Sequence, residues 1–273
     1  MTTPKAPPAP PNQALHEAPR THASAPRTFG QRAWAFIREL LIVVVGAVVV
    51  SSLLRAFVGQ MFIIPSQSME STLLVGDRVV VQKLTDFQRG DVVVFSDPGG
   101  WLEEEPIVDP PPWDKVLEFI GLPTSSTPGH LIKRVIGMPG DKVVCCTSKG
   151  RITVNGYPLD ERSYLYADPD DVQVDPSEIK FEVVVPKDKI FVMGDHRDLS
   201  ADSRCHLSDL STSQGKGQVA FVPISQVVGP AFAIAAPFDR AERLQRPETF
   251  AEVPAAKKPP PERAVIKPAG VNC

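Results

Sequence analysis

The sequence predicts a mainly antiparallel β protein that follows a single N-terminal membrane helix. Two observations indicate this class. Short runs rich in β-branched residues alternate with turn signals through the middle of the chain, and an uncharged apolar run from Leu40 to Leu54 precedes them. The 273 residues suffice for one or two domains with tails. The net charge is -3 and no basic stripe is visible, so we expect no nucleic acid as the main partner.

The apolar run is long enough to cross a bilayer once it is extended back to Trp34. A spanning helix needs about 20 mostly apolar residues, and Arg38 and Glu39 lie near one end, where charged side chains can reach the interface. A cleaved signal peptide and a buried core helix are the alternatives. Large residues follow the run in place of the small residues of a cleavage site, so we expect an uncleaved anchor over residues 34–54.

Charge sets the expected orientation of this anchor. Lysine and arginine outnumber acids before it, whereas Arg55 is the only base after the run until Arg78. The positive-inside rule therefore predicts a single-pass protein of the cell membrane, with a cytoplasmic N-terminus and everything after the anchor outside. Residues 1–33 (rich in Pro and Ala) and residues 241–273 bury too little apolar area to offset ordering entropy, so we expect two disordered tails.

Turn chemistry separates the candidate strands. Pro139-Gly140-Asp141 is one such turn, and residues 152–159 are typical of a short hairpin with an Asn155-Gly156 turn. Many short strands with close turns favour a sandwich or barrel-like fold. Residues 97–130 interrupt this alternation of strands and turns with a long loop that is either functional or mobile. The candidate strands are residues 77–83, 91–95, 131–136, 142–146, 151–154, 181–185, 189–193 and 227–235.

A serine and a lysine carry the candidate chemistry. Ser68 follows the anchor closely, and Lys133 lies among apolar neighbours in sequence. A serine paired with a lysine can perform acyl transfer without histidine. Burial lowers the lysine pKa, and a lysine tuned to about 7–8 can accept the hydroxyl proton. Ser66 lies two positions before Ser68, so both face one side of an extended segment. Four segments stand out together: Pro65–Leu73, Gly76–Val81, Ile132–Asp141 and Gly194–Arg204.

In this order behind an anchor, the four segments resemble the boxes of bacterial type I signal peptidase, the leader peptidase. The resemblance covers residues 34–240 in patches. It implies a membrane-bound serine endopeptidase that cleaves Ala-x-Ala signal peptides from exported preproteins. Ser68 then corresponds to the nucleophile and Lys133 to the general base, and the Ser66 hydroxyl joins the Ser68 N–H in the oxyanion hole. We expect no metal or cofactor, and as partners only secretory preproteins and the lipid bilayer, with a monomeric protein.

The fourth segment supplies supporting roles in this resemblance. Ser200 corresponds to a serine that hydrogen-bonds and orients the lysine, and Asp202 and Arg204 correspond to an ion pair near the site. The resemblance also implies the organisation of the chain. A catalytic β domain over residues 55–144 and 186–240 contains the mobile insert, and a smaller inserted β domain occupies residues 145–185.

Two positions depart from the family pattern. Many members have a proline before the threonine, where this chain has Glu70-Ser71, and others often have asparagine in place of His196. We expect the first departure to alter the turn and to leave the chemistry intact.

Substrate binding follows from the same resemblance. Residues 62–65 and 130–133 should flank the nucleophile, and an extended signal peptide adds between them as a strand, with alternate side chains entering pockets. Small, shallow pockets fit Ala-x-Ala sites. The implied pocket residues are Phe62, Ile64, Pro65, Met69, Leu73 and Ile132.

Other interpretations of these residues remain open. Asp195-His196 could belong to a Ser-His-Asp triad, and His196, Asp198 and Asp202 could hold a metal, although neither fits the lysine-based pattern. The chain could also be a Ser/Lys peptidase dedicated to one conjugation or assembly substrate, or a membrane-anchored β protein that is a scaffold without activity.

The chain has four cysteines. Cys145 and Cys146 are adjacent on an expected strand, so their side chains should point in opposite directions. A disulfide is permitted outside the membrane. We expect either Cys145 or Cys146 to pair with Cys205, and Cys273, in the expected tail, to be free.

Overall fold

The computed structural model of the chain describes residues 29–57, 59–83, 85–102, 129–211 and 215–267. The chain divides into two compact units, Met1–Gly46 and Ala47–Cys273. Most of the expected N-terminal tail, residues 103–128 of the expected mobile insert, and Cys273 lie outside the described residues.

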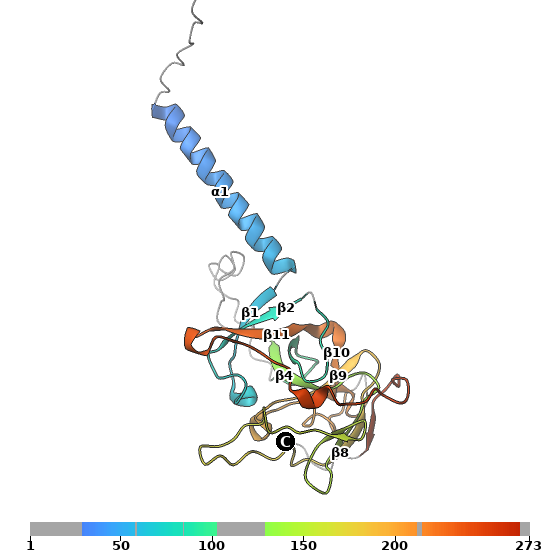
Figure 1. Ribbon diagram of the computed structural model, residues 1–273. Helices are drawn as coiled ribbons and strands as arrows, with labels where there is room; N and C mark the ends of the chain where they lie inside the picture. Colours follow the sequence, from blue (N-terminus) through green and yellow to red (C-terminus); the bar gives the residue numbers. More distant parts are fainter. Residues whose placement is uncertain (1–28, 58, 84, 103–128, 212–214, 268–273) are drawn as a thin grey trace, which may run out of the picture. The chain divides into compact units, whose positions relative to one another are not determined.

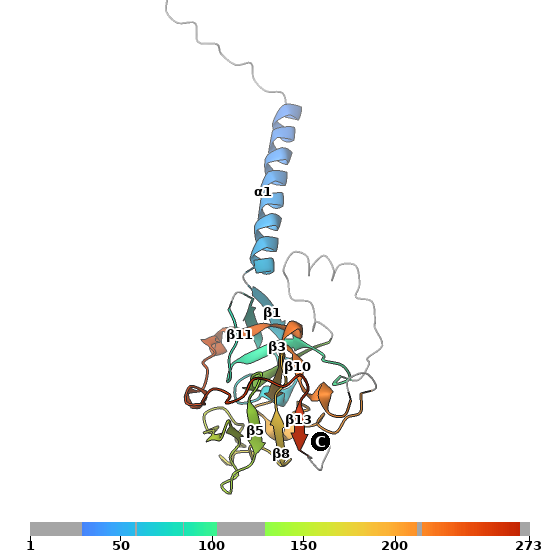
Figure 2. The same cartoon turned by 90° about the vertical axis from the view of Figure 1, so that its right-hand side faces the viewer.

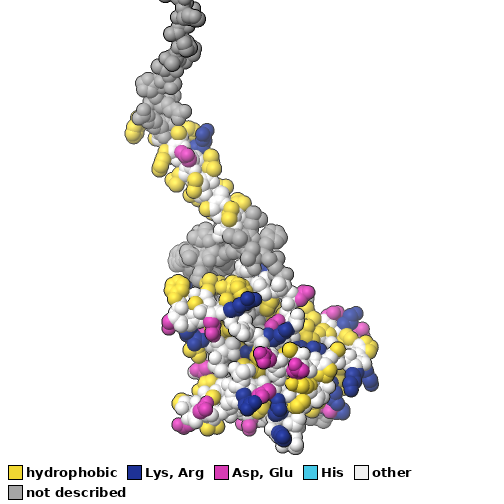
Figure 3. All heavy atoms as spheres, in the orientation of Figure 1, with side chains coloured by type: hydrophobic (Ala, Val, Ile, Leu, Met, Phe, Trp, Pro, Cys, Tyr) yellow, Lys and Arg dark blue, Asp and Glu magenta, His cyan; other side chains and the backbone are white. Residues whose placement is uncertain are grey.

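The expected anchor is a helix that is longer at both ends than the predicted 34–54. Helix α1 runs from Phe29 to Phe57. Its stretch Ala33–Ser51 has a mean hydropathy of 2.3, is not buried inside the protein, and is long and apolar enough to cross a membrane. On the helix face seen in Figure 3, the charged side chains gather near the beginning and apolar side chains follow. An apolar surface of this kind is typical of a helix that faces lipid.

The second unit contains a large antiparallel sheet (Figure 1), as the sequence predicted. Its strand order is β1-β2-β11-β3-β4-β9-β10, and β12 pairs with β11. Valine and isoleucine dominate these strands because β-branched side chains pack well on a pleated surface. The bounds are β1 Gly59–Ile63, β2 Arg78–Gln82, β3 Val92–Ser96, β4 His130–Gly137, β9 Lys189–Met193, β10 Val222–Pro223, β11 Val227–Ala236 and β12 Glu242–Arg243.

A second, five-stranded sheet has the order β13-β8-β5-β6-β7. Strands β6 and β7 form the predicted hairpin, and Asn155 and Gly156 have φ values of 53° and 86°, as a two-residue type I′ turn requires. In Figures 1 and 2, β1 and β8 lie at opposite ends of the unit. The bounds are β5 Lys142–Cys145, β6 Thr153–Val154, β7 Tyr157–Pro158, β8 Phe181–Val184 and β13 Val265–Lys267.

The second sheet is not a domain with its own core. One hydrophobic cluster joins Ile136 and Phe191 of the large sheet to Val143 and Val183 of the second sheet. The expectation of a separate inserted domain at 145–185 is therefore replaced by two sheets around a shared core within one compact unit.

The expected C-terminal tail is ordered as far as residue 267, so the prediction of disorder over 241–273 is wrong for that stretch. β13 pairs with β8, and Phe250 and Val253 are buried in the shared cluster. The few apolar residues of this proline-rich stretch gain their burial against a surface that other segments build. Composition within the stretch itself gives no sign of that surface.

The expected cysteine pairing is also wrong. Cys145 and Cys146 form a disulfide with each other, and the peptide bond between them is cis. β5 ends at Cys145, so the alternation of side chains along a strand no longer separates the two sulfurs. Cys205 is disulfide-bonded as well, but to neither of these residues.

Candidate active site

Ser68 lies on a tight turn that follows strand β1. We call residues Gln67–Leu73 the nucleophile turn. It begins with the 3-10 helix Gln67–Met69. The backbone N–H groups of Glu70 and Leu73 donate to the carbonyl oxygens of Gln67 and Met69 at 2.9 and 2.8 Å. Met69 and Leu73 are fully buried, so the turn is fixed to the core on one side.

Lys133 meets Ser68 from the central strand β4. The Nζ atom of Lys133 lies 2.5 Å from the Oγ atom of Ser68, and the two residues are only 3% and 5% exposed. β4 pairs Lys133 with Val93 of β3, which fixes the backbone from which the side chain reaches the turn. The expected pair of serine and lysine is thus in hydrogen-bond contact and shielded from water.

Burial lowers the pKa of Lys133 from its ordinary 10.5 to about 8. Loss of solvation is the largest cause, because an apolar site disfavours the ammonium form. The negative charges of Asp202 and Asp195 oppose this shift, and the positive charge of Arg204 adds to it. A lysine with this pKa is partly neutral in weakly alkaline solution and can accept a proton there.

Ser66 lies beside the nucleophile and is exposed. Its Oγ atom is 3.3 Å from the Oγ atom of Ser68. The two hydroxyls lie on one side, as expected, but Ser68 belongs to a 3-10 helix and not to an extended segment. Ser68 Oγ therefore contacts both a base and a second hydroxyl.

Ser200 does not make the expected hydrogen bond to Lys133. Its Oγ atom is buried and has no hydrogen-bond partner among the described residues. The side chain instead packs against Gly194, where a Cβ atom would overlap both Ser200 Oγ and the carbonyl oxygen of Ser68. The glycine allows three segments to meet, and the serine fills the space beside it.

Asp202 and Arg204 form the expected ion pair. Arg204 Nη2 lies 2.9 Å from Asp202 Oδ2, and both side chains are buried. Asp202 also accepts the backbone N–H of Gly194 at 2.9 Å. Burial opposes ionisation of this carboxyl, but the Arg204 guanidinium and the N–H donors outweigh it and hold the pKa of Asp202 below its ordinary value.

A second buried ion pair holds the end of the nucleophile turn, and the sequence did not reveal it. Arg134 donates to both carboxylate oxygens of Asp195 at 2.8 and 2.6 Å. The hydroxyl of Thr72 donates to Asp195 Oδ2 at 2.6 Å. Arg134 follows Lys133 on β4 and therefore points to the opposite face of the strand. The sequence feature that could have predicted this ion pair was the presence of the polar residues Thr72, Arg134 and Asp195 in the four segments.

His196 also binds the turn, but not as the base of a triad. Its backbone N–H donates to the carbonyl oxygen of Ser68 at 3.1 Å, and its Nδ1 atom lies 3.2 Å from Oε2 of Glu70. Its ring stacks on Tyr166 at a centroid distance of 3.8 Å. The Ser-His-Asp interpretation is therefore wrong, since Ser68 Oγ is bonded to Lys133.

The expected substrate-binding segments lie close together. β1 is an edge strand, and β4 pairs with β9 only from Arg134 onward, which leaves the 130–133 part of β4 open on that side. Three strands separate β1 from β4 in the sheet, yet the rings of Phe62 and His130 lie 5.4 Å apart. The sheet thus curls and forms two free edges beside the nucleophile.

The expected pocket residues mostly belong to one cluster at this place. Pro65 is exposed, whereas the other expected pocket residues are buried in a cluster that contacts the nucleophile turn. These buried residues are Phe62, Ile64, Met69, Leu73 and Ile132.

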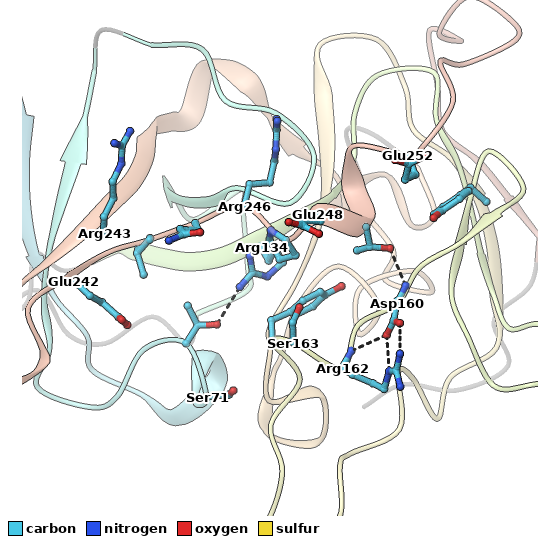
Figure 4. A pocket seen from close by; sticks show the side chains of 17 residues that line it. Ser71, Arg134, Asp160, Arg162, Ser163, Glu242, Arg243, Arg246, Glu248 and Glu252 are labelled. Carbon is cyan, nitrogen blue, oxygen red and sulfur yellow. Dashed lines mark hydrogen bonds and ion pairs between the residues drawn. The ribbon is translucent and has the colours of Figure 1, made fainter.

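A polar cleft of about 970 Å³ lies on the other side of β4 (Figure 4). Arg134 points into it, and residues 242–249 form one wall. Neither Ser68 nor Lys133 lines this cleft. Among the described residues, no group of three His, Cys, Asp or Glu side chains is arranged to hold a metal ion.

The chain is similar in sequence to several known proteins. The family model described as signal peptidase, peptidase S26, matches residues 37–236. "Signal peptidase I" of Mycobacterium tuberculosis is 37% identical over 226 residues, which cover 75% of this chain and 74% of that protein. "Probable signal peptidase I" of Mycobacterium leprae is 34% identical over 231 residues, covering 74% and 77%.

More distant relatives have the same name. "Signal peptidase I" of Leptolyngbya laminosa is 30% identical over 236 residues, which cover 85% of this chain and 96% of that protein. A crystal structure of a signal peptidase I from Enterococcus faecalis is 19% identical and covers 54% of this chain and 97% of that one, with a TM-score of 0.28.

Proposed function

Since the chain belongs to the signal peptidase family, peptidase S26, we propose that it cuts signal peptides with Ser68 as nucleophile and Lys133 as general base. The chain is a serine endopeptidase of that family. One observation carries the assignment of the dyad. The Nζ atom of a buried lysine with a lowered pKa lies 2.5 Å from the hydroxyl of a buried serine.

The proposed reaction is acyl transfer in two steps. Neutral Lys133 takes the proton of the Ser68 hydroxyl as Oγ attacks the carbonyl carbon of the scissile bond. The Ser68 N–H and the Ser66 hydroxyl donate to the developing oxyanion, and each such donor lowers the barrier by about 3 kcal/mol. The Lys133 ammonium then protonates the leaving amine. Water, activated by the same lysine, releases the signal peptide from Ser68.

The position of the free strand edges supports the proposed binding mode. The signal peptide adds as an extended strand between β1 and the 130–133 part of β4, through main-chain hydrogen bonds. Alternate side chains then face the buried cluster around Ile64 and Ile132. Small, shallow pockets at these positions would favour alanine at both, which is the Ala-x-Ala rule.

The proposed location is the outer surface of the cell membrane. Helix α1 is long and apolar enough to span the bilayer once, and the excess of basic residues before it favours a cytoplasmic N-terminus. Only residues 55–67 separate the apolar run from Ser68, so the nucleophile stays near the bilayer, where exported preproteins emerge. The enzyme acts there as a monomer on substrates held by the same membrane.

Reconstituted full-length protein tests this function. Liposomes that contain the chain are given a preprotein with an Ala-x-Ala site, and the product is located by mass spectrometry. We expect cleavage after the second alanine and strongly reduced cleavage when that alanine is replaced by a larger residue. Ser68→Ala provides the blank. No cleavage by the unmutated chain, or cleavage indifferent to both alanines, would contradict the proposal.

A further inference from the structure

The nucleophile turn is held at three points by the segment that follows β9. The backbone N–H of His196 donates to the carbonyl oxygen of Ser68 at 3.1 Å. The hydroxyl of Thr72 donates to Asp195 at 2.6 Å. Between them, Glu70 Oε2 lies 3.2 Å from His196 Nδ1. The His196–Ser68 contact involves only main chain, and the Thr72–Asp195 contact lies at the far end of the turn. The contact between Glu70 and His196 therefore links the middle of the turn to the residue that binds the Ser68 carbonyl.

The ring of His196 is held by two neighbours, Tyr166 against one face and Glu70 at Nδ1. Its side chain is 8% exposed, and its ring lies nearly parallel to that of Tyr166, at 17° and 3.8 Å. The N–H of Tyr166 donates to the carbonyl oxygen of Asp195 at 3.2 Å, which ties the stacking partner to the same segment. A carboxylate only accepts hydrogen bonds, so Nδ1 carries the hydrogen shared with Glu70.

The turn needs such a restraint because its backbone is strained directly after Glu70. Ser71 has a φ value of 90°, in the left-handed region that residues with a Cβ atom rarely adopt. Ser71 is also exposed, so its own side chain adds little packing to hold that conformation. Relaxation at Ser71 would swing Glu70 and displace the carbonyl of Ser68 from His196.

We infer that Glu70 and His196 form a positioning pair, which holds the nucleophile turn so that Ser68 Oγ remains at Lys133 Nζ. This inference rests on the proposed function, because it concerns the same nucleophile. Neither residue touches the reacting atoms. The pair acts through the main-chain hydrogen bond between His196 and Ser68, and its loss should slow the reaction more than it weakens substrate binding.

A double-mutant cycle on the full-length protein in liposomes tests the pair. We expect Glu70→Ala and His196→Ala each to lower kcat roughly ten-fold with KM little changed, since small displacements of reacting groups cost up to about 10²-fold. The double variant should lose little more than either single variant. Glu70→Gln keeps an acceptor oxygen and should recover most of the rate. Multiplied losses in the double variant, or no recovery in Glu70→Gln, would overturn the inference.

A second histidine–carboxylate pair among the described residues gives a matched control. His206 Nδ1 lies 2.7 Å from Asp209 Oδ2, outside the nucleophile turn. Asp209→Ala should leave kcat within about two-fold, because this partly buried pair makes no contact with the nucleophile turn.

Hydrogen exchange reports on the turn without any substrate. In Glu70→Ala, but not in Asp209→Ala, the amides of residues 67–73 and of His196 should exchange roughly ten-fold faster. Unchanged exchange would refute the pair whether or not the enzyme is active. Full activity in Ser68→Ala would instead refute the proposed function, so the two failures are distinguishable.

Discussion

The Nζ atom of Lys133 lies 2.5 Å from the Oγ atom of Ser68, although 65 positions separate the two residues in the chain. Ser68 lies on a turn after the edge strand β1, and Lys133 lies on the central strand β4, with three strands between the two in the sheet. The curl of the sheet brings them together. Because both are buried, the lysine pKa is lowered and the pair can exchange a proton.

The rate of cleavage should rise with pH through about 8. The pKa of Lys133 in the folded protein is about 8, and only the neutral amine can act as the base. Below that pH the lysine is protonated and kcat/KM should fall about ten-fold per pH unit. A pH profile between 6 and 10 on a signal-peptide substrate checks this. A profile that is flat or falling between pH 7 and 9 would contradict it.

Asp202→Asn should move the rising part of the pH profile of cleavage to lower pH. The negative charge of Asp202 raises the pKa of Lys133, so its removal lets burial lower the pKa further. The change also leaves Arg204 buried without its partner and should destabilise the fold by about 3–5 kcal/mol.

Asp160→Asn is the matched control for Asp202→Asn. Asp160 pairs with Arg162 at 2.5 Å, but both are exposed, so neither the profile nor the stability should change noticeably. Chemical denaturation and the pH profile measure the two effects. If the rising part of the profile stays in place or moves to higher pH in Asp202→Asn, then the charge of Asp202 does not raise the pKa of Lys133.

Lys133→Met should abolish activity and stabilise the fold at pH 7. Between about pH 8 and 10.5 the unfolded lysine is still protonated while the folded lysine is neutral, so stability rises with pH in that window. Below it the folded protein bears the full cost of a buried ammonium, on the order of 3 kcal/mol. Methionine has no such cost. Urea unfolding at pH 7 tests this, and a less stable variant would be the contrary result.

Ser71→Gly should stabilise the protein and Ser71→Pro should disrupt the site. Glycine adopts the φ value of 90° without the cost of roughly 1 kcal/mol that a Cβ atom incurs. Proline is fixed near −65° and cannot adopt it. We expect a higher thermal midpoint in the first variant and at least ten-fold slower cleavage in the second. Equal activity of Ser71→Pro and the unmutated chain would show that the turn tolerates another conformation.

Local signals in the sequence predicted the parts of the fold that depend on neighbours in the chain. The Asn155-Gly156 hairpin follows from backbone preferences alone, and the apolar run predicted helix α1. The antiparallel sheets and the family were also predicted, because turn residues and four ordered segments mark them. These features need no knowledge of tertiary packing.

Several parts that depend on distant contacts were missed, although the four segments did predict the distant pair Ser68 and Lys133. Phe250 and Val253 order the C-terminal stretch only because segments far away build a hydrophobic surface for them. The pairing of Glu70 with His196 joins residues 126 positions apart. Ser200 was assigned a bond to the lysine by resemblance, whereas its side chain packs against Gly194. Sequence patterns identify such residues as polar or apolar, but they do not specify which partner each one meets.

The steady-state rates of Ser68→Ala, Lys133→Ala and the double variant test the central claim most directly. When two catalytic residues act as one unit, removing either one already removes most of their joint contribution to the rate. Each single variant should therefore lower kcat at least about 10³-fold, and the double variant should lower it little further. The assay uses full-length protein in liposomes and an Ala-x-Ala preprotein. A single variant that retains kcat within about ten-fold of the unmutated chain would contradict the Ser68/Lys133 dyad.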